Sequence, residues 1–194
     1  VALIILSEFI VITLFQRGAF TEFESQQTAM ALIAFSSGLP AYILIKVLAP
    51  GFFAREDTKT PVKIAVVAMI LNLILNLILM IPLAHVGLAL ATALSSWVNA
   101  LALFYLLKIK GYLKIDKLIK SRVLKIIFST IVLAIFLIFS EHHLDAFTTF
   151  PLSLKILSIC MIIFASLLIY FFIIHVLGVA KINIIWKSRG KKLA

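Results

Sequence analysis

The residues of this chain that could do chemistry are polar side chains inside long apolar stretches. Asn72 and Asn76 lie four residues apart, which places them on one face of a helix. A second polar stripe follows at helical spacing and consists of Thr92, Ser95, Ser96 and Asn99. If the chain reverses near Ala84, residues equally distant from that turn lie at the same depth. This geometry places Asn76 level with Thr92, and Asn72 level with Ser96.

Two kinds of chemistry fit these two stripes. Neutral side chains can form hydrogen bonds between helices, worth on average about 0.6 kcal/mol per pair in a membrane. A cluster of neutral oxygens can instead coordinate a hard cation such as Na⁺. Because neither stripe contains a carboxylate, hydrogen bonding is the favoured interpretation.

Two charged side chains, Glu8 and Lys46, also interrupt apolar stretches. A carboxylate in the middle of a membrane span is by default functional or paired, so Glu8 is a candidate for lining a cavity. Lys46 lies close to the end of its stretch and can extend its ammonium group to the lipid headgroups. The alternative for Lys46 is a cavity-facing cation that contacts a phosphate.

The sequence contains no constellation for bond-breaking chemistry. The spacing of its histidines fits no metal or catalytic motif, and no Gly-rich phosphate loop, nucleophile elbow or zinc signature is present. These histidines are His85, His142, His143 and His175. The single cysteine, Cys160, excludes an internal disulfide. We therefore predict a protein that is not an enzyme and has no cofactor, with Na⁺ coupling as the open alternative.

The elements that position these residues are apolar segments long enough to cross a membrane. Hydrophobic residues make up 63% of the 194 residues and charged residues 13%, against about half and a quarter in soluble domains. Blocks of roughly 20 apolar residues can cross about 30 Å of hydrocarbon. The sequence predicts an all-α polytopic bundle with six spans, at residues 1–15, 28–49, 62–82, 87–107, 123–140 and 152–178.

The first predicted span is short, because the chain starts at Val1 inside an apolar run. We expect this chain to be the C-terminal piece of a longer membrane protein, cut within a helix. The second predicted span should end at Ala49-Pro50-Gly51, where proline and glycine interrupt helices. A charged loop follows, and Pro61 suits the first turn of the next helix.

The basic residues predict the orientation of the chain. The loop 51–63, the connection 108–125 and the tail contain 15 of the 18 lysine and arginine residues. Basic loops stay in the cytoplasm, so the net charge of +10 indicates topology and not nucleic-acid binding. We predict a basic, partly interfacial connection at 108–122, in which Tyr112–Lys120 forms a short helix on anionic phospholipid headgroups. The basic tail, 179–194, is predicted to be cytoplasmic.

Three segments of the chain are similar to a known family. They are LFQRGAFT at 14–21, GLPAYILIKVLAPGFFAREDTKTPVKI at 38–64, and the asparagine-bearing stretch that follows. These segments resemble the MviN/MurJ family of lipid II flippases, in the multidrug/oligosaccharidyl-lipid/polysaccharide exporter superfamily. Phe9, where a proline is expected after Ser7-Glu8, is a small departure.

The resemblance implies the C-terminal part of a 14-helix protein. Residues 1–107 would form four helices of the C-terminal transport lobe, the first of them truncated, and 123–178 two additional transmembrane helices. The missing N-terminal lobe would be a partner. The family moves lipid II, the precursor of peptidoglycan, from the inner to the outer leaflet of the bacterial inner membrane by alternating access. The alternatives are a sister exporter of drugs or of another lipid-linked oligosaccharide, and a non-transporting membrane scaffold.

The resemblance also implies roles for individual residues. Arg55, Asp57 and Lys59 match a cytoplasmic motif and would belong to the inner gate. Asn72, Asn76 and Thr92 fall where some members hold a sodium ion, although a carboxylate is expected at the position of Asn76. Four aromatic residues of the last two helices would line a groove for the polyprenyl tail of the substrate, or would simply face lipid: Phe128, Phe136, Phe164 and Phe171.

Overall fold

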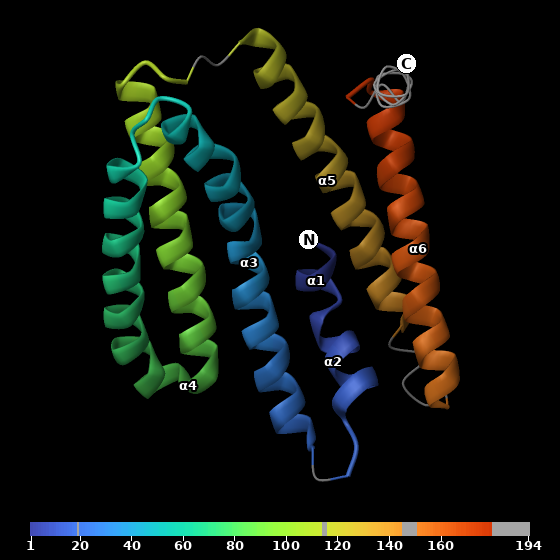
Figure 1. Cartoon of the computed structure of the whole chain (residues 1–194). Coiled ribbons are helices and arrows are strands. Elements are labelled where there is room, and N and C mark those ends of the chain that lie inside the picture. The colour runs from blue at the N-terminus through green and yellow to red at the C-terminus, as the bar shows by residue number, and fades with distance from the viewer. Residues whose placement is uncertain (19, 114–115, 145–150, 180–194) are drawn as a thin grey trace, which may run out of the picture. The chain divides into compact units, whose positions relative to one another are not determined.

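The structure is a computed structural model that describes residues 1–18, 20–113, 116–144 and 151–179. These residues form six helices, and no strand occurs among them (Figure 1). The helices are α1 (Ala2–Ile5), α2 (Ser7–Phe15), α3 (Glu22–Phe53), α4 (Lys59–Ile109), α5 (Lys117–Leu144) and α6 (Leu152–Val176). The predicted all-helical membrane fold is confirmed.

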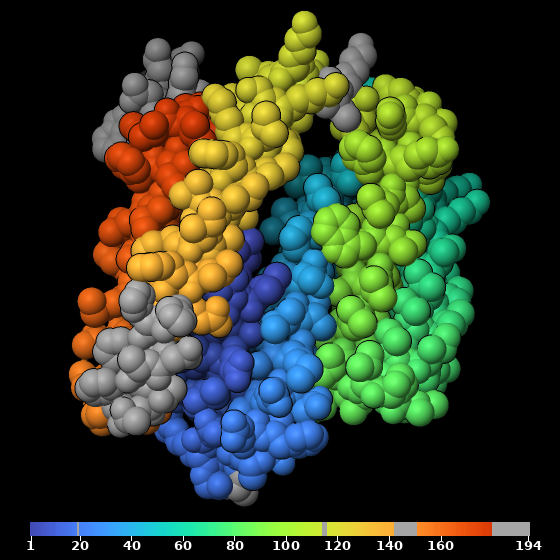
Figure 2. Space-filling model, turned by 180° about the vertical axis from the view of Figure 1, so that it is seen from behind, coloured from blue at the N-terminus to red at the C-terminus, as the bar shows by residue number. Residues whose placement is uncertain are grey.

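Four of these helices are long and apolar enough to cross a membrane: α3, α4, α5 and α6. The 51-residue α4 reverses direction at Ala84, whose φ of 47° and ψ of −128° are not helical. Its two limbs therefore lie side by side and correspond to the predicted spans 62–82 and 87–107 (Figures 1 and 2). The first predicted span is divided into α1, of 4 residues, and α2, of 9 residues, and each is shorter than a span.

The chain consists of two compact units. One unit contains Leu6–Lys114, and the other contains Val1–Ile5 together with Ile115–Ala194. The change from one unit to the other at Lys114 lies within the predicted connection 108–122. The polar residues of the candidate sites described below belong to the unit Leu6–Lys114. The candidate aromatic residues of α5 and α6 belong to the other unit.

Small residues bring the backbones of α3 and α4 close together. A Cβ atom on Gly38 would lie 2.9 Å from the Cα atom of Ala93. A Cβ atom on Gly87 would lie 2.2 Å from the carbonyl oxygen of Leu79 on the other limb of α4. Such close approach of helices is typical of membrane proteins, in which packing of small residues replaces the hydrophobic effect between helices.

Helix α3 ends later than the sequence predicts. It continues through Pro50 and Gly51 to Phe53, so the predicted break at Ala49-Pro50-Gly51 is wrong. The missing N–H of Pro50 removes a single hydrogen bond, to the carbonyl of Lys46 in the last turns. Burial offsets that loss, because Phe52 is 0% exposed in a cluster with Leu48, Leu103 and Leu107.

The second unit contains α5 and α6, which pack against one another. The ammonium group of Lys125 on α5 donates a hydrogen bond of 2.7 Å to the carbonyl oxygen of Leu177, just beyond α6. Helix α5 begins at Lys117, six residues before the predicted span. Lys117–Lys120 is therefore the first turn of α5 and not part of a separate interfacial helix; Lys114 and the tail from residue 180 lie outside the described residues.

Candidate functional site

The loop after α3 and the segment after α4 follow helix C-termini of similar geometry. Beyond α3, the amide of Asp57 donates to the carbonyl of Phe52 (3.2 Å), and the amide of Glu56 donates to Phe53 (3.0 Å). Beyond α4, Tyr112 donates to Leu107 (2.9 Å). Both patterns are Schellman motifs, with a left-handed residue at the turn. That residue is Glu56 (φ 59°) after α3 and Gly111 (φ 68°) after α4.

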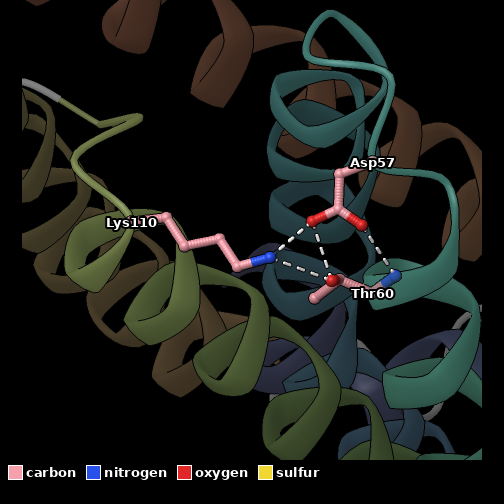
Figure 3. A network of polar contacts seen from close by, with 3 residues as sticks. All are labelled: Asp57, Thr60 and Lys110. Atoms are coloured by element: carbon pink, nitrogen blue, oxygen red, sulfur yellow. Dashed lines mark hydrogen bonds and ion pairs between the residues drawn. The ribbon is translucent and has the colours of Figure 1, made fainter.

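One lysine joins these two termini. The ammonium group of Lys110 donates to Oδ2 of Asp57 at 2.5 Å and to Oγ1 of Thr60 at 3.1 Å (Figure 3). Thr60 in turn donates its amide to Oδ1 of Asp57 (3.1 Å) and its hydroxyl to Oδ2 (2.8 Å). Asp57 thereby also caps the first turn of α4. We call Asp57, Thr60 and Lys110 the Lys110 clamp.

Aromatic rings form a second connection beside the Lys110 clamp. The guanidinium carbon of Arg55 lies 4.6 Å from the centre of the Tyr112 ring, within the range of a cation–π interaction. Tyr112 meets the buried ring of Phe52 edge to face, with 6.3 Å between the ring centres. The loop after α3 and the segment after α4 are therefore joined both by charge and by aromatic contact.

The Lys110 clamp fixes the charge states of its two ionisable members. The hydrogen bond from Lys110, with smaller contributions from Thr60, lowers the pKa of Asp57 to about 2. The same hydrogen bond raises the pKa of Lys110 above its usual value. Both groups are therefore charged over the whole physiological pH range.

The structure separates the three residues that the sequence assigns to the inner gate. Asp57 belongs to the Lys110 clamp, Arg55 stacks on Tyr112, and Lys59 is exposed, with no side-chain hydrogen bond or ion pair to the described part of the chain. Sequence reasoning missed Lys110. A signal was available, because Asp57 and Lys110 lie at nearly equal distances along the chain from the reversal at Ala84.

Asn72 and Asn76 form a chain of hydrogen bonds, one of which joins the two limbs of α4. Asn76 donates to Oδ1 of Asn72 (2.7 Å), and Asn72 donates to the hydroxyl of Ser95 (2.9 Å). The partner of Asn72 differs by one residue from the predicted Ser96. These side chains line a cavity of about 580 Å³. Thr92 does not line it; its hydroxyl donates to the carbonyl of Leu88 in its own helix (2.8 Å).

The same side chains bear on the alternative of a sodium site. The oxygen of Asn72 accepts from Asn76, and Ser95 donates onward to the carbonyl of Thr92 (3.1 Å). Oδ1 of Asn76 is buried and, among the described residues, has no hydrogen-bond partner. Among the described residues, the lining of this cavity is neutral and offers no carboxylate to a hard cation. The described residues fit the hydrogen-bonding interpretation.

The remaining candidates do not join these sites. Glu8 on α2 and Lys46 on α3 are exposed, and neither lines the asparagine cavity. In the other unit, Phe128, Phe164 and Phe171 are 55%, 64% and 65% exposed, while Phe136 is half-buried. Exposure of this kind is compatible with either a groove or a lipid-facing surface.

Comparison with known proteins identifies the family. The model of the family "Lipid II flippase MurJ" matches residues 1–156. A probable lipid II flippase MurJ from Rhizobium meliloti (strain 1021) is 37% identical over 190 residues, which cover 96% of this chain and 35% of that protein. A protein with the same description from Rickettsia prowazekii (strain Madrid E) is 38% identical over 142 residues, covering 73% of this chain and 28% of that protein.

A solved structure gives the same result for the fold. The structure titled "Lipid II flippase MurJ, inward closed conformation" superposes with a TM-score of 0.63 at 28% identity, covering 89% of this chain and 33% of that one. The chain thus spans about a third of the length of these relatives. Because the family model matches most of its residues, the chain belongs to the MurJ family of lipid II flippases.

Proposed function

We propose that this chain is the C-terminal part of a lipid II flippase, a transporter of the bacterial inner membrane. It would help to move the lipid-linked peptidoglycan precursor from the inner to the outer leaflet by alternating access, without making or breaking a bond. The family match over residues 1–156 carries this proposal. The N-terminal lobe, membrane phospholipids and lipid II itself would be its partners.

The proposed orientation rests on charge. The basic loop 51–63 and the start of the basic connection, residues 108–113, are at one end of the helices in the unit Leu6–Lys114, and the turn at Ala84 is at the other (Figure 1). Because basic ends remain in the cytoplasm, the turn at Ala84 would face outward and the C-terminus inward. The membrane potential or an ion would then shift the population between inward-open and outward-open states.

The proposed roles of individual residues follow from this orientation. The loop with Arg55, Asp57 and Lys59 would form part of the inner gate, since it is at the cytoplasmic end of α3 and α4. Glu8 and Lys46 would face the substrate cavity of the complete protein. The exposed aromatic residues of α5 and α6 would contact the polyprenyl tail.

Depletion of the full-length protein in living cells tests the proposal. A flippase predicts that undercrosslinked cell walls, accumulated lipid II and lysis follow depletion, and that the wild-type gene rescues them. Altered drug tolerance with normal lipid II levels would favour the sister exporter. Full rescue by a gene in which Glu8, Lys46 and Arg55 are all alanine would favour a scaffold without transport.

A further inference from the structure

The Lys110 clamp joins two segments that are far apart in sequence and lie outside the helices. Asp57 and Lys110 are separated by 53 positions. The loop 54–58 follows α3, and the segment 110–113 follows α4. Each segment also forms Schellman hydrogen bonds to its own helix end, and Tyr112 and Leu113 pack against the buried cluster that contains Phe52. Two helix ends without contacts between them can open locally and independently of one another.

We infer that Lys110 is a positioning residue that makes the loop 54–58 and the segment 110–113 open and close as one cooperative piece. It acts through Asp57 and Thr60, which both accept from its ammonium group. The Arg55–Tyr112 contact joins the same two segments, and Tyr112 also contacts Phe52 at the end of α3. The inference concerns only contacts within the unit Leu6–Lys114 and does not depend on the proposed transport function.

Asp57 therefore has a structural role in the loop 54–58. Both oxygens of its carboxylate are already engaged by Lys110 and Thr60, so its charge holds the loop in shape and is not free for an opposing group. Arg55, Glu56 and Lys59 are the exposed charges of this loop. The Lys110 clamp would present them in a fixed arrangement on the cytoplasmic end of the helices.

Hydrogen–deuterium exchange on the full-length protein in nanodiscs tests the inference through reciprocal substitutions. Lys110→Met should speed exchange in a peptide that covers Asp57 and Thr60 by roughly fivefold or more, because the local closed state loses its cross-link. Asp57→Asn should speed exchange of Tyr112 and Leu113 to a similar extent. Lys110→Arg keeps the cation and should retain most of the protection.

Lys108→Met is the matched control. Lys108 is an exposed lysine at the same helix end, and its ammonium group forms no hydrogen bond or ion pair with the described part of the chain. It should leave exchange in the peptide 54–60 unchanged. The charge-reversed pair Asp57→Lys with Lys110→Asp should restore the protection of Tyr112 and Leu113 that each single reversal removes; it is not compared at Thr60, because a lysine at position 57 cannot accept from Thr60.

Three results would overturn the inference. The first is faster exchange confined to the segment that carries the substitution. The second is an equal effect of Lys108→Met at residues 54–60. The third is a charge-reversed double variant that exchanges as fast as the single variants. If Lys110→Met lowers the amount of folded protein, the comparison of Asp57→Asn with wild type at Tyr112 and Leu113 decides the question alone.

Discussion

At the scale of single residues, the carboxylate of Asp57 is at the centre of the Lys110 clamp. Its carboxylate accepts from the side chain of a lysine on another element and from both donors of Thr60. A carboxylate in such a setting keeps its charge in acid, because protonation would remove an acceptor from each donor. Its role is therefore testable by titration.

The Lys110 clamp should lose strength only in strong acid. The pKa of Asp57 is lowered to about 2 from its usual value of 3.8, so the stabilisation is complete above the unfolded value and is lost as the pH falls towards 2. We expect the difference in melting temperature between wild type and Asp57→Asn to vary by no more than about a degree from pH 5 to 8. Below pH 4 this difference should shrink. A difference that instead declines between pH 7 and 5 would contradict this assignment.

The two asparagines should differ in their importance for stability. Asn72 uses both its amide and its oxygen in hydrogen bonds, whereas Oδ1 of Asn76 has no partner among the described residues. Asn72→Ala should therefore lower stability by roughly 1 kcal/mol and Asn76→Ala by less, in line with hydrogen bonds measured in membranes. Thermal unfolding in detergent measures both.

Sodium provides the control for that experiment. Because the cavity offers no carboxylate among its described lining residues, we expect the melting temperature of the wild-type protein to be the same in sodium and potassium chloride. A rise that is specific to sodium and is abolished by Asn76→Ala would show that the cavity binds the ion after all.

The sequence was sufficient to predict the polar stripes but not all of their partners. The symmetrical spacing of residues about Ala84 predicted the pairing of Asn72 to within one residue, because a tight reversal fixes the depth of both limbs. The same symmetry reaches Lys110, but its lysine-rich surroundings resemble a general membrane anchor. Which of several lysines pairs with Asp57 depends on the turn after α4, which only the three-dimensional structure shows.

At the scale of elements, the fold of the unit Leu6–Lys114 depends on close contact between backbones. Gly87 allows the second limb of α4 to approach the carbonyl of Leu79, and Gly38 allows α3 to approach Ala93. Trp97 adds a hydrogen bond of 3.0 Å from its indole nitrogen to the carbonyl of Ser37. The turn between the limbs is correspondingly tight.

Gly87→Ala should separate the two limbs of α4. The new Cβ atom would be 2.2 Å from the carbonyl oxygen of Leu79, and a backbone atom cannot move aside as a side chain can. We expect destabilisation of about 1–3 kcal/mol, typical of overpacking, with a lower melting temperature. Ala89→Gly, two residues away, removes a methyl group without adding a clash and serves as the control; an equal or larger loss there would contradict the packing argument.

Element boundaries show where local sequence signals fail. Proline and glycine at 50 and 51 predicted the end of a helix, yet α3 continues to Phe53. Burial outweighs the tendency of proline and glycine to end a helix there, because Phe52 is buried against residues of α4 that lie about fifty positions later in the chain. No local pattern contains that information.

At the scale of the whole molecule, the charge pattern predicts an orientation that can be measured. In a full-length protein with Cys160→Ser, a cysteine replacing Glu56 should react with a membrane-impermeant maleimide only after the cytoplasmic face is exposed. A cysteine replacing His85, at the turn of α4, should react in intact spheroplasts. Labelling of position 56 from outside would reverse the proposed topology.

The central claim is that this chain forms the C-terminal part of a protein that carries lipid II across the inner membrane. The most direct measurement is the fraction of lipid II that an impermeant probe reaches in the outer leaflet of spheroplasts, before and after depletion of the full-length protein. We predict that this fraction falls sharply on depletion while total lipid II rises, and that the wild-type gene restores both. An outer-leaflet fraction that stays constant after depletion, in cells without a second flippase, would contradict the account.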